Sequence, residues 1–265
     1  MLRLLLSTAL AAGLASGVCA QEITVGAANV SNYLDPGRDH SNVGSQFYYN
    51  VFDTLIDKNH DTLDAEWQPA LATEWNLVDP KTMELKLREG VTFQNGEAMT
   101  ADDVVFSLNR MYQATFPPYV VRARDRLANF VKAEKVDDLT VRVSVEKEEP
   151  LWETLLNLQQ VMIIPEDYTK GLTGDPEVAE DDDFEAFSLA PVGTGPYRVA
   201  EFIPGERVVY ERFDGFWGEK APLAKATVQQ IPETASRVTA LKTGEADIIT
   251  NIAPDQLAMI ESDSN

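Results

Sequence analysis

The alternation of hydrophobic and polar residues along the chain predicts several strands. A short apolar run over 22–28 predicts a buried strand. Hydrophobic residues alternate with polar ones over 83–88, and a turn at 89–90 then predicts a return strand at 91–93. The same alternation predicts a strand over 139–145. These patterns indicate sheets with one face buried and the other face exposed.

Helical spacing appears in the segments between these strands. Hydrophobic residues recur at helical spacing over 46–55 and predict a helix in the core. Thr100, followed by the acidic residues Asp102 and Asp103, predicts the N-cap and first turn of a helix over 101–112. The pattern therefore mixes helices and strands in the manner of an α/β fold.

The last third of the chain combines a hairpin with a β–α–β sequence. Strands are predicted at 197–203 and 207–212, on either side of a Pro-Gly turn. A strand at 226–231, a helix at 233–243 and a strand at 246–250 follow. Gly244 lies where a helix commonly ends in a left-handed residue. A further helix is expected to begin at Pro254.

The first 20 residues have the composition of a secretory signal peptide. Arg3 precedes an apolar stretch, and small residues at Val18 and Ala20 suit cleavage before Gln21. We expect a soluble protein exported to the periplasm, because no later stretch reaches the roughly 20 apolar residues of a membrane span. Cys19, the single cysteine, would leave with this segment, so no disulfide or thiolate site is expected.

Composition and charge exclude several classes of function. The net charge of −21 argues against binding to nucleic acid, whose phosphates an acidic surface repels. His40 and His60, the two histidines, lack metal-ligand spacing, and the acidic run over 175–185 lacks the glycine of a calcium loop. No metal or other cofactor is expected. The sequence also contains no recognisable nucleophile motif, so we do not expect an enzyme.

The segment PVGTGPYRV over 191–199 contains two closely spaced glycines but not a nucleotide loop. No lysine follows Gly195 in the spacing of a P-loop, and no third glycine completes a dinucleotide-binding motif. Pro196 removes a backbone N–H that an anion would need, and the segment leads into a strand instead of a helix. We interpret it as a tight turn in which the glycines free the backbone.

Three longer stretches share motifs with a known family. Residues 69–111 contain A-x-x-W, L-R-x-G-V-x-F and T-A-D-D-V-x-F-S; residues 191–219 contain GTGPY and a Phe-Trp pair; residues 228–248 end in A-L-x-x-G-E-x-D-I. In this order they resemble the extracellular solute-binding proteins of family 5, the peptide/nickel-type periplasmic components of ABC transporters. The resemblance extends from about residue 22 to the end of the chain.

The resemblance implies a periplasmic-binding-protein type II-like α/β lobe that carries a large inserted α+β subdomain. Residues 21–50 and 186–265 would form the lobe and residues 51–185 the insertion. Members of the family hold a solute between two such lobes, and we expect the second lobe to be absent from this sequence. The implied partners are a small solute, most simply a peptide, and the membrane permease subunits of an ABC importer, with the protein itself a monomer.

Ligand-binding candidates lie in loops at strand ends. They are the segment after the first predicted strand (Asn29, Val30, Ser31, Asn32 and Tyr33) together with Tyr119 and Tyr197. Each could instead pack against the core. The four tryptophans could stack on a sugar or a peptide ring, although core packing is the better interpretation for Trp75 and Trp217.

Three functions are compatible with these observations. The first is a solute-binding protein without catalysis, whose solute could be a peptide, a nickel complex, a sugar or another small molecule. The second is a truncated chain that no longer binds. The third is a secreted hydrolase that uses two carboxylates, for which the sequence locates no pair.

Overall fold

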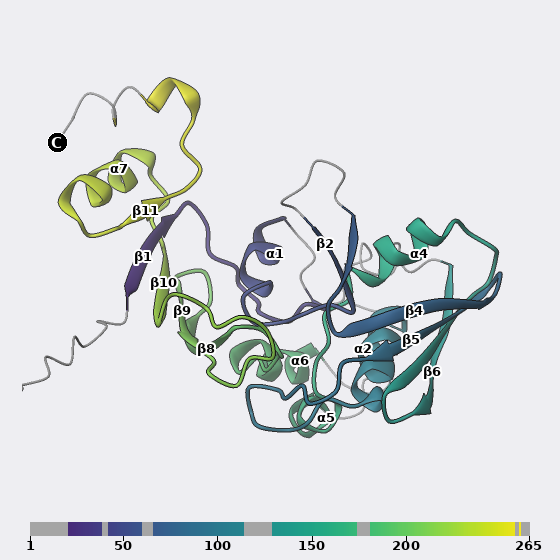
Figure 1. Cartoon of the computed structure of the whole chain (residues 1–265). Coiled ribbons are helices and arrows are strands. Elements are labelled where there is room, and N and C mark those ends of the chain that lie inside the picture. Colours follow the sequence, from purple (N-terminus) through teal and green to yellow (C-terminus); the bar gives the residue numbers. More distant parts are fainter. Residues whose placement is uncertain are drawn as a thin grey trace, which may run out of the picture.

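The fold is built around three β-sheets, which lie side by side with helices packed between and below them (Figure 1). The computed structural model describes residues 21–38, 42–59, 66–113, 129–173, 181–257 and 260. The predicted signal segment, His40, His60, Tyr119 and most of the acidic run lie outside these residues. The domain boundaries given above stay predictions.

The four-stranded sheet is antiparallel throughout and has the order β4-β5-β7-β6. Its strands are β4 (Ala72–Asp79), β5 (Thr82–Leu87), β6 (Phe130–Asp137) and β7 (Thr140–Val145). Alternation places Met83, Leu85 and Leu87 on the buried face, as predicted. This face joins the larger hydrophobic cluster, which also includes residues from α2 (Ala101–Gln113).

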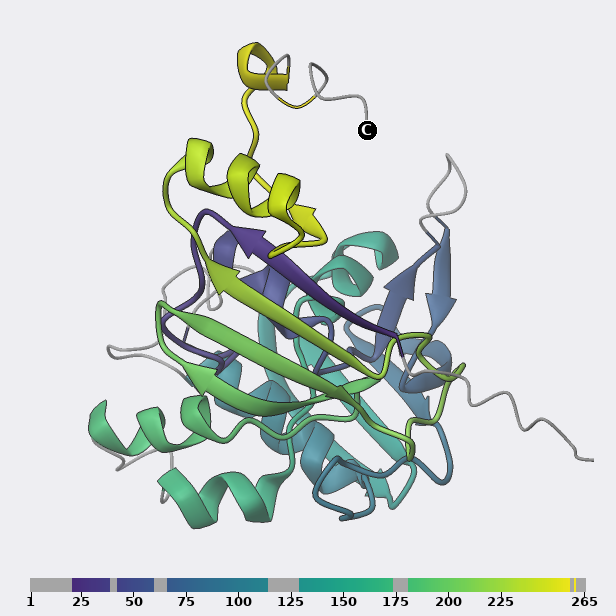
Figure 2. The same cartoon turned by 90° about the vertical axis from the view of Figure 1, so that its left-hand side faces the viewer.

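The five-stranded sheet joins the beginning of the chain to its last third. Its order is β11-β1-β10-β9-β8, and Figure 2 shows it face-on. β1 (Glu22–Ala27) pairs in parallel with β10 (Lys225–Gln230) and β11 (Ile248–Ile249), whereas β9 (Arg207–Arg212) pairs antiparallel with β10 and with β8 (Tyr197–Ile203). The predicted hairpin and β–α–β sequence are confirmed.

The remaining elements surround these two sheets. β2 (Ile56–Lys58) and β3 (Trp67–Pro69) form a separate hairpin. α4 (Leu151–Leu158), α5 (Glu166–Thr173) and α6 (Asp181–Leu189) follow the four-stranded sheet in the chain. α7 (Thr234–Thr243) packs against β1 and β11 and ends at Gly244 in the predicted left-handed conformation, with φ 75°. After β11 a 3-10 turn, Pro254–Gln256, begins at Pro254, where the sequence predicts the start of a helix.

The predicted helix over 46–55 is wrong in its extent. The helix α1 covers Asn42–Tyr48, and the chain is irregular from Tyr49 to Asp53. Val51 and Leu55 are nevertheless buried, as their hydrophobicity predicts. Helical hydrogen bonding stops because the carbonyls of Asn50 and Val51 accept hydrogen bonds from the distant residues Tyr197 and Gly195.

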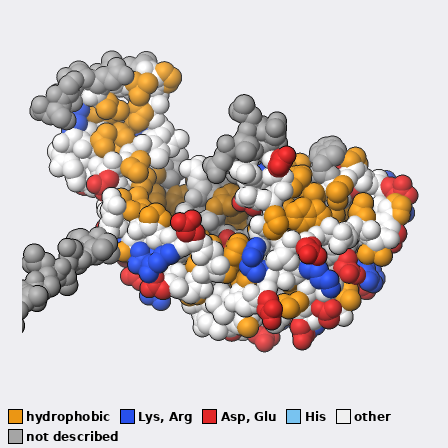
Figure 3. All heavy atoms as spheres, in the orientation of Figure 1, with side chains coloured by type: hydrophobic (Ala, Val, Ile, Leu, Met, Phe, Trp, Pro, Cys, Tyr) orange, Lys and Arg blue, Asp and Glu red, His pale blue; other side chains and the backbone are white. Residues whose placement is uncertain are grey.

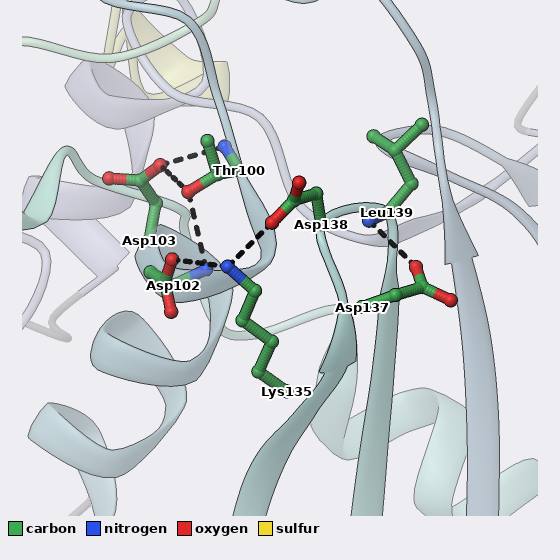
Figure 4. Close-up of polar contacts among 7 residues, drawn as sticks. All are labelled: Thr100, Asp102, Asp103, Lys135, Asp137, Asp138 and Leu139. Atoms are coloured by element: carbon green, nitrogen blue, oxygen red, sulfur yellow. Dashed lines mark hydrogen bonds and ion pairs between the residues drawn. The ribbon is translucent and has the colours of Figure 1, made fainter.

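The predicted return strand at 91–93 is also wrong, because β5 pairs with β4 and β7 instead. Residues 91–100 form an irregular segment that leads to α2. There the Thr100 hydroxyl accepts a hydrogen bond from the Asp102 N–H, and the Asp103 carboxylate accepts one from the Thr100 N–H (Figure 4). The predicted N-cap is therefore confirmed as a reciprocal capping arrangement.

Lys135 joins this helix start to β6. Its ammonium group contacts the carboxylates of Asp102 and Asp138, both at 2.7 Å (Figure 4). Hydrogen bonds to these two carboxylates raise the pKa of Lys135. All three side chains are exposed to solvent, so water and salt screen the attraction and its contribution to stability is small.

The GTGPY turn packs against the backbone of Asn50 and Val51, in the irregular segment that follows α1. A Cβ on Gly193 would lie 2.2 Å from the Val51 carbonyl oxygen, and one on Gly195 would lie 2.7 Å from the Val51 carbonyl carbon. Neither glycine is among the residues with positive φ. The glycines are therefore needed for close backbone approach, and the interpretation that they free the backbone to turn was wrong.

Gln94 completes this junction from the irregular segment before α2. Its side-chain amide donates to the carbonyls of Val51, Gly195 and Tyr197 at 2.8–3.1 Å. Its side-chain oxygen accepts a hydrogen bond from the Gly193 N–H. One glutamine thus satisfies backbone groups of both the segment after α1 and the GTGPY turn.

Candidate functional site

The segment that follows β1 is the first part of the candidate site, and its residues differ in exposure. Val30 and Ser31 are buried, whereas Asn29 and Asn32 are exposed and Tyr33 is half-buried. The Ser31 hydroxyl donates to the Tyr33 carbonyl at 2.7 Å and accepts from the Tyr33 N–H at 3.2 Å. Within this segment the side chains of Asn29, Asn32 and Tyr33 are therefore the ones that solvent reaches, and their contact with a solute stays a prediction.

Arg38 stacks on Tyr33 in the same segment. The centre of the guanidinium group lies 4.0 Å from the centroid of the Tyr33 ring. The Nε and one terminal nitrogen of Arg38 are buried, and neither has a hydrogen-bond acceptor in the part of the chain that the structure describes. A buried guanidinium without an acceptor is costly, so this position favours an incoming anionic group.

A buried ion pair fixes this segment to α2. Arg110 donates two parallel hydrogen bonds to the Asp35 carboxylate, at 2.9 and 2.6 Å. Their side chains are 2% and 0% exposed. Asp35 also accepts from the Gly37 N–H and shapes the turn before Arg38. The pair therefore holds the loop after β1 against the helix that precedes residues 114–128, the stretch to which Tyr119 belongs.

Tyr197 lies at the start of β8 and is half-buried against the second hydrophobic cluster. Its N–H donates to the Asn50 carbonyl and its carbonyl accepts from Gln94. The backbone of Tyr197 is thus part of the junction, while its role in ligand binding stays a prediction. Tyr119 lies outside the described residues.

A cavity of about 310 Å³ forms the second part of the candidate site. It lies between the end of α1, the β2–β3 hairpin and the loop that joins β9 to β10. Aromatic side chains and two carboxylates contribute to its lining: Tyr49, Phe52, Phe216, Trp217, Asp53 and Asp57. Sequence patterns had not indicated this cavity.

Asp53 contributes a hydrogen-bonded carboxylate to this cavity. Its Oδ2 accepts hydrogen bonds from the Trp217 indole N–H at 2.8 Å and from the Thr194 hydroxyl at 2.9 Å. Burial raises the pKa of Asp53, while the hydrogen bonds from Trp217 and Thr194 oppose that shift and the nearby charge of Asp57 adds to it. The raised pKa means that the site disfavours an uncompensated negative charge.

These residues were missed because their partners are remote in sequence. Asp53 and Trp217 are separated by 164 positions, and the Phe-Trp pair was interpreted as a family motif that packs in the core. Trp217 does pack against the larger cluster, as predicted, and it also lines the cavity. Within the described residues, no group of three or more His, Cys, Asp and Glu is arranged to hold a metal ion.

Figure 3 shows a hollow in the surface between α7 and the β2–β3 hairpin. Hydrophobic side chains gather in and beside this hollow, and charged side chains gather on the lower side of the same view. In the same orientation, Figure 1 shows the chain after β1 running from the side of α7 towards α1. No helix among the described residues is both long and apolar enough to cross a bilayer.

The fold is that of the periplasmic binding proteins. The structure matches the ABC transporter-associated periplasmic binding protein DppA of Helicobacter pylori, in complex with the peptide STSA, with a TM-score of 0.78 and 26% identity. The match covers 92% of this chain and 49% of that protein. The expected α/β fold class is therefore confirmed.

The chain belongs to the bacterial extracellular solute-binding proteins, family 5, whose middle region matches residues 66–265. It is 27% identical over 241 residues to heme-binding protein A of Haemophilus influenzae, which covers 84% of this chain and 41% of that protein. It is 27% identical over 216 residues to the dipeptide-binding protein of Escherichia coli, covering 74% and 38%. The chain thus spans less than half the length of these two relatives.

Proposed function

We propose that this protein is a periplasmic solute-binding component that delivers a peptide or similar small solute to the permease of an ABC importer. Binding involves no catalytic step, and the protein acts as a monomer after cleavage of its signal segment. Membership of family 5 supports the binding role, and the names of two of the matched proteins support a peptide. In this proposal residues 21–50 and 186–265 form one lobe and residues 51–185 its insertion.

The observation that carries the choice of solute is the stacked Arg38 beside Tyr33. Two buried nitrogens of its guanidinium group, Nε and Nη1, have no acceptor among the described residues, and the carboxylate of a solute could accept a hydrogen bond from one of them. The exposed amides of Asn29 and Asn32 could bind the peptide backbone. A free peptide supplies both kinds of group.

Thermal unfolding of the full chain with a peptide and with its C-terminal amide tests this proposal. A peptide that binds only the folded state at 100 times its dissociation constant should stabilise it by about 2.7 kcal/mol. The amide should stabilise less, because it lacks the carboxylate that Arg38 would bind. Arg38→Gln should remove the difference between peptide and amide, whereas Arg198→Gln, on the outer face of β8, should preserve it.

Two results would contradict the proposal. Equal stabilisation by the peptide and its amide would exclude the role of Arg38, and no stabilisation by any peptide would exclude peptide binding by this chain. Mass spectrometry of the recovered peptide checks the absence of catalysis, because a hydrolase would return fragments.

A further inference from the structure

We propose that the cavity beside Asp53 is a second binding site, one that takes the ammonium group of a small alkyl or arylalkyl amine. The cavity volume of about 310 Å³ is at the lower end of the range for small-molecule sites. Its residues do not include the loop after β1 or Arg38, so this site does not depend on where the transported solute binds.

The carboxylates give the cavity its charge preference. Oδ2 of Asp53 already accepts two hydrogen bonds, while Oδ1 accepts none from the described residues. Asp57 accepts hydrogen bonds from the Lys58 N–H and from Gln159, at 2.7 and 3.4 Å. The described residues that line the cavity include two acids and neither lysine nor arginine, so the lining itself attracts a cationic guest.

The aromatic side chains make the cavity selective for an organic cation. Phe216 and Trp217 lie with ring centroids 5.3 Å apart, and Tyr49 and Phe52 supply further aromatic surface. Aromatic rings attract alkylammonium groups through their faces and bury the attached carbon chain. A fully hydrated metal ion would gain little from such walls.

A cation already packs on Trp217 in the structure. The guanidinium of Arg88 lies 4.4 Å from the centroid of the Trp217 ring, and its Nε donates to the Ala70 carbonyl. Arg88 is not among the residues that line the cavity. It therefore shows that this indole accepts a cation, while leaving the cavity itself without a positive side chain among the described residues.

Proton–nitrogen NMR of the tryptophan indole groups tests the proposal at the site itself. Each tryptophan gives one indole signal, and Trp217→Phe assigns the signal of Trp217 by its loss. Titration of the full chain with n-pentylamine at constant pH should shift the Trp217 signal and approach saturation. n-Pentanol, which has the same carbon chain without the charge, should shift it at least about tenfold less at equal concentration.

Asp57→Asn removes one negative charge and should weaken the binding of n-pentylamine about fivefold or more. The matched control is Glu74→Gln on β4, an exposed residue that is not part of the cavity lining, which should leave the binding unchanged.

Three results would overturn the site. The first is an unmoved Trp217 signal with n-pentylamine, and the second is an equal shift with n-pentanol. The third is the same shift with calcium chloride at matched ionic strength, which would show a general effect of cations. If n-pentylamine does not bind, the proposal of peptide binding is not affected, because the thermal-unfolding experiment uses a different ligand and different residues.

Discussion

Two of the three strand pairs in the four-stranded sheet, β4–β5 and β6–β7, join neighbours in sequence, whereas β1 in the five-stranded sheet pairs Glu22 with Lys225. The first sheet is held largely by alternating hydrophobic residues that join one large cluster. Polar groups matter more outside that sheet: Asp35 with Arg110, the half-buried Gln94 at the GTGPY turn, and Arg237 at α7. Hydrophobic periodicity thus explains most of the four-stranded sheet, whereas individual polar contacts hold the loop after β1, the GTGPY turn and α7.

Removing one partner of the buried ion pair should have the largest effect. Asp35→Asn should destabilise the folded state by about 4 kcal/mol, because Arg110 stays buried without its counter-charge. Glu166→Gln, which removes the carboxylate of the surface pair with Lys170, should cost about 0.5 kcal/mol or less. Urea unfolding followed by circular dichroism measures both, and equal effects would refute the importance of the buried ion pair.

A methyl group at Gly193 should rank next. Gly193→Ala should cost about 3 kcal/mol, because the new Cβ collides with the backbone of Val51, which cannot move away as a side chain could. Gly171→Ala provides the control with the opposite sign. Apart from its chain neighbours and the backbone of its own helix, no atom of the described residues lies within 4 Å of its Cβ position in α5, so alanine should stabilise the chain by up to about 1 kcal/mol. A neutral Gly193→Ala variant would refute the close approach.

Replacing Arg237 should remove the polar contacts that hold α7 to the chain on either side of it. Its guanidinium is buried and donates to the carbonyls of Ile231, Pro232, Thr250 and Asn251. Arg237→Met should cost about 2–3 kcal/mol, because these carbonyls lose their donor. Hydrogen exchange should show the loss of protection confined to α7 and β11. Arg198→Met on an exposed strand should change stability by about 0.5 kcal/mol or less, and protection lost throughout the chain would contradict this local role.

Replacing Asp53 should change stability least, and the size of this change should depend on pH. Because burial raises its pKa above the ordinary value of 3.8, its contribution to stability is present at low pH and is lost as pH rises through the folded-state pKa. The stability of Asp53→Asn relative to the natural chain should therefore increase between pH 4 and pH 7. Unfolding free energies at several pH values check this, and a constant difference would show that the pKa is not raised.

Sequence patterns identified the elements whose hydrogen bonds and hydrophobic contacts are local. The helix α2, the β8–β9 hairpin and the C-cap at Gly244 follow from residues within a few positions of one another. The segment after Tyr48 has helical spacing, but its backbone hydrogen bonds go to the GTGPY turn, so tertiary contacts override the local pattern.

The candidate site was predicted only in part for the same reason. The loop after β1 could be located because loops at strand ends are common binding positions. The acceptor-free guanidinium of Arg38 and the cavity beside Asp53 depend on which remote residues pack there, and no spacing in the sequence encodes that. Glycine spacing predicts a turn at 191–199, but only the structure shows that the carbonyl group of Val51 lies too close for any residue with a Cβ at Gly193 or Gly195.

The hydrogen bonds at the GTGPY turn suggest where a long segment of the chain could be deleted. Residues 50 and 51 are hydrogen-bonded to residues 197 and 195, so the two ends of the long segment between them lie side by side. A gene that lacks this segment would need only a few codons to rejoin the two cut ends. Its product would also need polar replacements for hydrophobic residues such as Phe47 and Tyr210, which now share a cluster with residues of that segment. Such a shortened chain would also lose Gln94, which now donates to the carbonyls of Val51, Gly195 and Tyr197 beside the cut.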